Sequence, residues 1–129
     1  MTAGANAAIV RRLLDALHAQ DLDAVTELLD PAVVVRSLKG TFQGPAEVRR
    51  WATKSDDGHL YSQVHVDEVD EFGDYVAVGA RRQWRWRETD ELGDEAPFGS
   101  LFRIRDGRIV DWRQHYDSIV DAIDAIPAQ

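Results

Sequence analysis

The sequence contains no cysteine, which excludes disulfide bonds, thiolate metal sites and a thiol nucleophile. It also lacks any apolar run that approaches the ~20 residues of a membrane-spanning helix. Basic residues are in the minority, because 15 Lys and Arg face 23 Asp and Glu and give a formal net charge of −8. A non-specific nucleic-acid binder would normally be basic. These absences predict a cytoplasmic protein without a signal peptide, a nucleic-acid partner or a membrane partner.

Metal-ligand patterns are missing as well. The acidic residues gather at predicted strand ends and turns, without the spacing of a calcium-binding loop. The four histidines include no pair at the i, i+4 spacing that one helical face would bring to a zinc ion. The sequence therefore predicts neither a metal site nor a cofactor.

The composition indicates one folded domain over residues 1–129, with 44% hydrophobic and 29% charged residues. In the first part of the chain the apolar residues follow helical spacing. Three helices are predicted: one after a cap at Asn6, one after a cap at Asp21, and one opened by Gly44-Pro45. A short β-branched strand is expected at 33–35.

From Leu60 onward the apolar residues alternate instead, which is typical of strands. The predicted strands are Leu60–Asp70, Tyr75–Glu88, Glu95–Asp106 and Arg108–Tyr116. Asp106-Gly107 is a strong signal for a two-residue hairpin turn, and a last helix is expected from Ser118 to Ala125, capped by Asp117 or Ser118. Helices followed by long strands predict an α+β domain with helices packed on one face of a curved sheet.

The order of elements and the segment GRIVDWRQHYD (107–117) resemble the nuclear transport factor 2-like superfamily. The pattern is most similar to SnoaL-like polyketide cyclases and limonene-epoxide hydrolases, and LLDALHAQDLDAV (13–25) and GPAEVRRW (44–51) share the likeness. The resemblance covers nearly the whole chain. It implies a cone-shaped, curved antiparallel sheet wrapped around the three N-terminal helices, a cystatin-like α+β barrel with a pocket at its wide end.

The resemblance also implies positions for a site. Limonene-epoxide hydrolases use an Arg and an Asp two residues apart on the second long strand, an Asp on the last strand, and a Tyr and an Asn on the short strand. These positions carry over to Arg81, Gln83, Gln114, Val35 and Ser37, so only the arginine is retained. Because a glutamine amide cannot exchange a proton near neutral pH, epoxide hydrolysis through carboxylates is not expected.

If the inward positions of the family hold, the pocket contains a histidine that could act as a base. The predicted catalytic residues are His65 as general base, Arg81 as electrostatic stabiliser, and Gln83 and Gln114 as donors to a developing oxyanion. The predicted substrate-binding residues are Leu14, Leu17, Val35, Ser37, Arg85, Phe98, Ser100, Trp112 and Tyr116. The alternatives are an exposed or hydrogen-bonded strand histidine, and arginines paired with acids at a strand end.

The same choice of inward positions predicts a homodimer through the outer face of the sheet. Its apolar residues would be Val64, Val66, Trp84, Trp86 and Leu101. The alternative sends Trp84 and Trp86 into the core and Arg81 and Arg85 to solvent, as a bulge before Arg81 would do.

Together these features predict a cofactor-independent enzyme of the isomerase, lyase or cyclase type. Its substrate would be a small, largely apolar molecule with a polar or anionic group. Two alternatives stay open: a non-catalytic, ligand-binding or accessory dimeric protein whose pocket has lost the family's acids, and a purely structural dimerisation domain.

Overall fold

The computed structural model describes residues 4–53 and 60–127. The elements in chain order are α1 (Ala5–Ala19), α2 (Leu22–Glu27), β1 (Leu29–Ser37), β2 (Gly40–Gln43), α3 (Gly44–Ala52), β3 (Leu60–Phe72), β4 (Tyr75–Trp86), β5 (Leu92–Arg105), β6 (Arg108–Tyr116) and α4 (Ile119–Asp124). The predicted α+β class, the helices followed by long strands and the last helix are confirmed. None of the described helices is long and apolar enough to cross a membrane.

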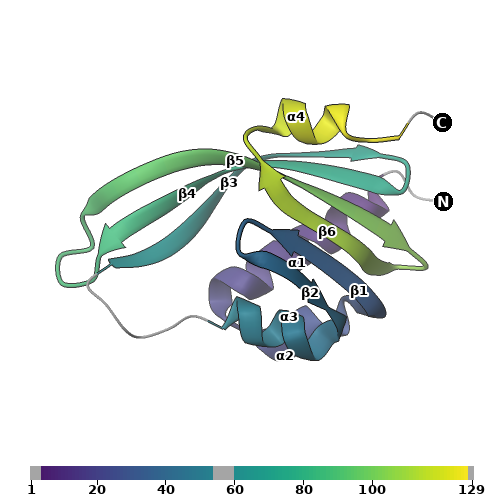
Figure 1. Ribbon diagram of the computed structural model, residues 1–129, viewed down its shortest axis with the longest axis horizontal. Coiled ribbons are helices and arrows are strands. Elements are labelled where there is room, and N and C mark those ends of the chain that lie inside the picture. The colour runs from purple at the N-terminus through teal and green to yellow at the C-terminus, as the bar shows by residue number, and fades with distance from the viewer. Residues whose placement is uncertain (1–3, 54–59, 128–129) are drawn as a thin grey trace.

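The six strands form one curved, open sheet in the order β2-β1-β6-β5-β4-β3 (Figure 1). The sheet is not wholly antiparallel, which corrects the prediction, because β6 returns alongside β1 in the same direction. The helices α1, α2 and α3 lie on one face of the sheet, called here the inner face, and α4 lies on the other, the outer face. The long strands β3, β4 and β5 extend past the helices, so one end of the sheet projects (Figure 1).

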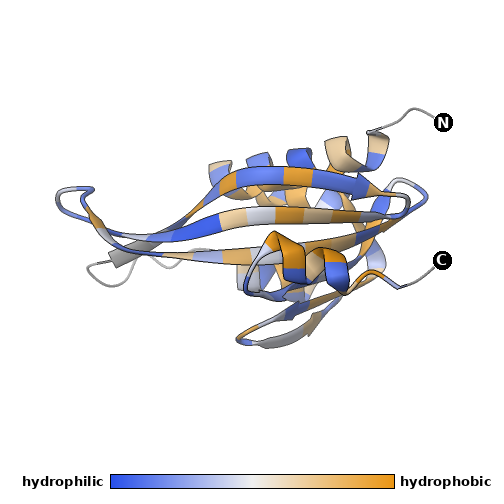
Figure 2. Cartoon of the chain, turned by 90° about the horizontal axis from the view of Figure 1, so that it is seen from above, coloured by the Kyte–Doolittle hydropathy of each residue, from blue (hydrophilic) through white to orange (hydrophobic). Residues whose placement is uncertain are grey.

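The main core lies between the three N-terminal helices and the inner face. Its fully buried side chains include Val10, Leu13 and Val25 from the helices and Phe102 and Trp112 from the strands. Hydrophobic and hydrophilic residues accordingly alternate along the strands (Figure 2). This packing holds the helices against the part of the sheet that the pocket described below adjoins.

A second, smaller core lies on the outer face. It contains Ala77, Leu101 and Ala122, which the helix α4 covers. The helix approaches the sheet so closely that a Cβ atom on Gly99 would lie 2.0 Å from the backbone oxygen of Ser118. Only a glycine leaves room for this contact, so the sheet is covered on both faces at this point.

The first helix begins differently from the prediction. Asn6 does not cap it: the N-cap is Gly4, and the Asn6 amide donates to the carbonyl oxygen of Gly73 at 3.0 Å. The carboxylate of Glu71 on β3 instead accepts hydrogen bonds from the backbone N–H groups of Gly4 at 3.1 Å and Ala7 at 2.7 Å. A residue 64 positions away in the sequence therefore satisfies the helix N-terminus.

The other local signals are confirmed. Asp21 accepts from the backbone N–H of Ala24, and Ser118 accepts from that of Asp121, so each caps its helix. Asp106 and Gly107 have φ values of 53° and 78°, as a two-residue turn with two positive φ angles requires. These turns and caps depend on adjacent residues alone.

The inward or outward direction of the side chains on β4 follows from a run of five buried residues, 76–80. Val78 and Ala80 pack in the main core, whereas Ala77 packs beneath α4. Strict alternation then sends Arg82 and Trp84 to the inner face and the odd-numbered residues to the outer face.

On β3 a bulge decides the direction. Val64, Val66 and Val69 all pack against the main core, although 66 and 69 differ by an odd number. The register with β4 shifts between Val66 and Glu68, which leaves Asp67 as the extra residue. Val69 faces inward, so without the bulge regular alternation would turn Asp67 and His65 inward as well. Because the bulge inserts one residue, His65 faces outward instead.

Candidate ligand pocket

The inner face holds a pocket of about 740 Å³ between α1, the end of α3, the β1–β2 turn and the strands β3, β4, β5 and β6. The described residues that line it are Leu14, Leu17, His18, Gln20, Ser37, Leu38, Lys39, Trp51, Ala52, Thr53, Ser62, Val64, Val66, Val78, Ala80, Arg82, Trp84, Arg87, Phe98, Ser100, Trp112 and Gln114. Its size and its mixture of apolar walls with few polar groups are typical of small-molecule sites.

Several residues predicted to bind substrate lie in this pocket. They are Leu14, Leu17, Ser37, Phe98, Ser100 and Trp112, and the predicted catalytic residue Gln114 lies there too. Val35 does not line the pocket, because it is fully buried in the adjoining core. Tyr116 packs on the outer face with the cluster beneath α4. The register between β5 and β6 shifts between Gly99 and Leu101, and this bulge turns Tyr116 away from the face that holds Gln114.

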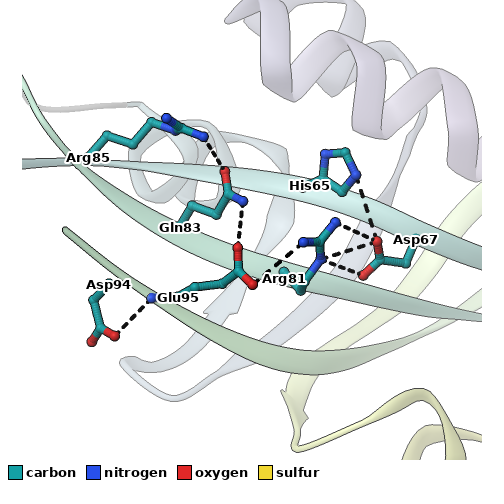
Figure 3. Close-up of polar contacts among 7 residues, drawn as sticks. All are labelled: His65, Asp67, Arg81, Gln83, Arg85, Asp94 and Glu95. Carbon is teal, nitrogen blue, oxygen red and sulfur yellow. Dashed lines mark hydrogen bonds and ion pairs between the residues drawn. The ribbon is translucent and has the colours of Figure 1, made fainter. Parts of the chain in front are cut away.

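The other predicted polar residues do not face the pocket. His65, Arg81, Gln83 and Arg85 lie on the outer face, in one chain of polar contacts that spans β3, β4 and β5 (Figure 3). The carry-over from the family is therefore wrong by one residue on β4. The arginine that faces the pocket is Arg82, and its neighbour two positions on is Trp84.

The outer-face contacts centre on Arg81. Its guanidinium donates to both oxygens of Asp67 at 2.9 to 3.2 Å and forms an ion pair with Glu95 at 3.5 Å. Gln83 donates to the other oxygen of Glu95 at 2.6 Å, and His65 lies 3.7 Å from Asp67. The hydrogen bond from Arg81 holds the pKa of the Asp67 carboxyl below its usual range. For Arg81 these contacts fit the alternative in which an arginine pairs with acids, whereas Arg85 donates to the Gln83 side chain and to the backbone oxygen of Asp90.

The same strand directions place the residues of the predicted dimer interface on different faces of the sheet. Val64, Val66 and Trp84 line the pocket, and Leu101 is buried under α4. Trp86 alone of the predicted set is largely exposed, at the projecting end of β4. These five residues therefore do not form one exposed patch on the outer face, and the homodimer itself stays a prediction.

Sequence reasoning missed the central cation of the pocket. The Arg82 guanidinium carbon lies 4.8 Å from the centre of the Phe98 ring, which faces the same cavity. Burial lowers the pKa of Arg82, and no carboxylate among the residues at 4–53 and 60–127 forms an ion pair with it. The sequence holds no local signal for it, because the run 75–80 is apolar at every position and does not show which alternate residues face the pocket.

Deeper in the pocket, polar groups from three neighbouring strands lie at one level. Arg113 pairs with Arg36 on β1 and with Leu101 on β5, so the adjacent residues Ser37, Gln114 and Ser100 lie side by side on the inner face. Trp112 lies two residues before Gln114 on β6 and is only 1% exposed. Its indole nitrogen Nε1 is buried and has no hydrogen-bond partner among the described residues.

The charges of the described lining residues are all of one sign. Lys39, Arg82 and Arg87 are cationic, His18 can become so, and none of the described lining residues is an aspartate or glutamate. No group of three or more potential metal ligands occurs in the part of the chain that the structure describes. The arrangement can therefore bind an oxygen-rich or anionic group and donate hydrogen bonds to it.

Solved structures with this fold include several enzymes by name. A protein assigned as a polyketide cyclase from Sinorhizobium meliloti is 26% identical over 82% of this chain and 92% of its own, with a TM-score of 0.67. A second protein so assigned, from Xanthomonas campestris pv. campestris, is 22% identical over 87% and 90%, with a TM-score of 0.72. An LEH-like epoxide hydrolase of M. tuberculosis is 20% identical over 93% and 87%, with a TM-score of 0.67.

No curated protein matches the sequence. The family model described as the SnoaL-like domain matches residues 10–112. This match spans α1 to Trp112 and includes most of the elements that line the pocket. The chain therefore belongs to the SnoaL-like domain family, within the nuclear transport factor 2-like fold.

Proposed function

We propose that the protein is a cofactor-independent enzyme of the cyclase or isomerase type, which acts on a small, largely apolar carbonyl compound. The observation that carries the proposal is the donor group deep in the pocket. The amide of Gln114 and the hydroxyl of Ser100 lie at one level on the neighbouring strands β6 and β5, and both line the pocket. Both groups can donate a hydrogen bond to an oxygen of a bound ligand.

The chemistry needs a carbonyl oxygen at these donors. When a proton leaves the carbon next to the carbonyl, the electron pair moves onto the oxygen, and hydrogen bonds from Gln114 and Ser100 stabilise the resulting enolate. In an isomerisation the proton returns to a different carbon, and in a cyclisation the enolate carbon attacks a second carbonyl carbon. The polyketide cyclase names of two relatives agree with this class of reaction.

The candidate proton acceptor is His18, in the last turn of α1. It is the one histidine among the described lining residues, and histidine is the side chain that most often acts as a general base. It replaces His65, which faces the opposite side of the sheet.

The test is exchange of the α-protons of simple ketones, such as 1-tetralone and cyclohexanone, into deuterated water, followed by proton NMR. The wild-type protein is expected to accelerate the exchange. Gln114→Ala should slow it about 100-fold, the usual effect of losing one oxyanion donor. Gln83→Ala is the matched control, because this glutamine lies on the outer face and should leave the rate unchanged.

His18→Ala should slow the exchange, because it removes the proposed proton acceptor. Equal rates in the wild type and Gln114→Ala would overturn the role of the donors. A wild-type rate equal to that of buffer, for a ketone that binds, would overturn the enzyme proposal itself.

The second candidate is ligand binding without turnover. It is favoured by the absence of a carboxylate among the described lining residues, since carboxylates are the acid–base groups that the resemblance implies. A ligand at 100 times its dissociation constant would then stabilise the protein by about 2.7 kcal/mol in a thermal-shift experiment while the exchange rate stays at that of buffer.

A further inference from the structure

Two consecutive arginines on β4 have opposite surroundings. Arg81 faces outward and contacts the carboxylates of Asp67 and Glu95, which neutralise its charge. Arg82 faces the pocket, and no ion pair joins it to any residue in the described ranges. The protein therefore places one arginine in an internal ion pair and leaves the next one available to a ligand.

The surroundings of Arg82 hold its side chain in place. Its guanidinium lies over the Phe98 ring, 4.8 Å from the centroid, a contact that restricts the plane of the guanidinium without using its N–H donors. The side chain is half-buried, and burial lowers its pKa because water is partly removed from the charge. A cation in this position is stabilised by an anion that binds beside it.

The remainder of the pocket has one sign of charge, although the chain as a whole carries −8. Cationic side chains at the β1–β2 turn and at the end of β4 also line it, and the described lining contains no acid. The walls are otherwise apolar and aromatic, with Leu14 and Leu17 from α1 opposite the rings of Trp84 and Trp112. A bound molecule thus meets an apolar cavity with a guanidinium at one point on its wall.

We infer that the substrate class is an amphipathic carboxylate, a ring-containing apolar molecule whose single carboxylate is bound by the guanidinium of Arg82. As a statement about substrates, this inference rests on the proposed function, whereas the binding mode does not need turnover. Arg82 would anchor the charged group, and the donors around Gln114 would remain available for a carbonyl oxygen elsewhere in the same molecule. Phe98 would be a positioning residue that acts through Arg82.

The experiment compares carboxylates with their uncharged amides by isothermal titration calorimetry. The probes are 2-naphthoate with 2-naphthamide, and cyclohexanecarboxylate with cyclohexanecarboxamide. The wild-type protein should bind each acid about 10- to 100-fold more tightly than its amide, as one charged hydrogen-bonding group provides. This preference should decrease when the salt concentration rises.

The chain offers a matched control for the variant. Arg82→Gln should abolish the preference for the acid, whereas Arg81→Gln changes the net charge by the same amount on the outer face and should retain it. Phe98→Leu should reduce the preference without removing it. Circular dichroism checks the folding of each variant. If Arg82→Gln does not fold, Arg82→Lys keeps the charge without the planar fork and should show a smaller preference than the wild type.

The inference is overturned if the wild type binds no acid more tightly than its amide, if Arg82→Gln retains the preference, or if Arg81→Gln loses it to the same extent. These failures are distinct from that of the proposed function. An acid preference without α-proton exchange would sustain the binding mode and contradict the enzyme. Exchange of neutral ketones without an acid preference would support the enzyme and contradict the binding of a carboxylate by Arg82.

Discussion

Arg81 holds Asp67 through hydrogen bonds to both carboxylate oxygens, at the position where β3 contains one residue more than β4. The pair joins the bulged residue to the neighbouring strand, and it lies on the face opposite the pocket. The same bulge turns His65 outward and leaves Val64 and Val66 facing the cavity.

The first prediction concerns the acid in this pair. Arg81→Gln should raise the pKa of the Asp67 carboxyl toward its usual range, because the hydrogen bond from Arg81 is the main cause of its depression. The measurement is a carbon-13 NMR titration of the carboxyl group. Arg85→Gln is the control, because Arg85 contacts Gln83 and Asp90 instead of Asp67. An unchanged pKa in Arg81→Gln would show that the pair does not persist in solution.

The sign of the accompanying stability effect follows from the same shift. A carboxyl whose pKa is depressed in the folded state stabilises the fold above its unfolded pKa, and this contribution is lost as the pH falls through the folded pKa. The difference in melting temperature between wild type and Arg81→Gln should therefore be largest near neutral pH and vanish in acid. It should be small, because both side chains are more than a third exposed.

The second prediction concerns the contact between β5 and α4. Gly99→Ala should destabilise the fold by about 1–3 kcal/mol or more, since the new methyl group would overlap the backbone oxygen of Ser118. Chemical denaturation measures the loss. Gly79→Ala provides a graded comparison and should cost less, because its Cβ would lie 3.1 Å from the Ile119 Cβ, a tight contact but not the 2.0 Å overlap found at Gly99. Equal effects of the two substitutions would mean that α4 is displaced easily.

The third prediction concerns the start of α1. Glu71→Ala should destabilise the protein by about 1 kcal/mol and increase amide hydrogen exchange in the first turn, because it removes the acceptor for Gly4 and Ala7. Asn6→Ala should leave that exchange nearly unchanged, since Asn6 caps nothing and donates to Gly73. A larger increase in amide exchange in Asn6→Ala than in Glu71→Ala would show that Asn6 caps α1, as the sequence predicts.

The fourth prediction separates two tryptophans on one strand. Trp84→Ala should weaken the binding of 2-naphthoate without changing the sedimentation coefficient, because Trp84 lines the pocket. Trp86→Ala should have little effect on binding, because Trp86 is 47% exposed and is not among the described lining residues of that pocket. A change in oligomeric state in Trp84→Ala alone would contradict the inward assignment.

The sequence by itself determined the α+β class, the positions of the long strands to within a few residues, the Asp106-Gly107 turn and the helix caps at Asp21 and Ser118. Each of these depends on neighbouring residues: local spacing, a side chain that caps its own helix, or a pair that tolerates positive φ. The inward positions implied by the family resemblance, and not a local signal, placed Gln114 and Ser100 among the pocket residues, where the structure also has them.

Only the tertiary structure decided which arginine faces the ligand. Alternation has a period of two, so an error of one residue exchanges the two faces of a strand. Arg82 instead of Arg81 is set by the helix that covers Ala77 on the outer face, and the direction of His65 is set by a bulge in β3. Glu71 caps α1 from 64 residues away. Such contacts join segments distant in the sequence, and no local pattern in this chain carries them.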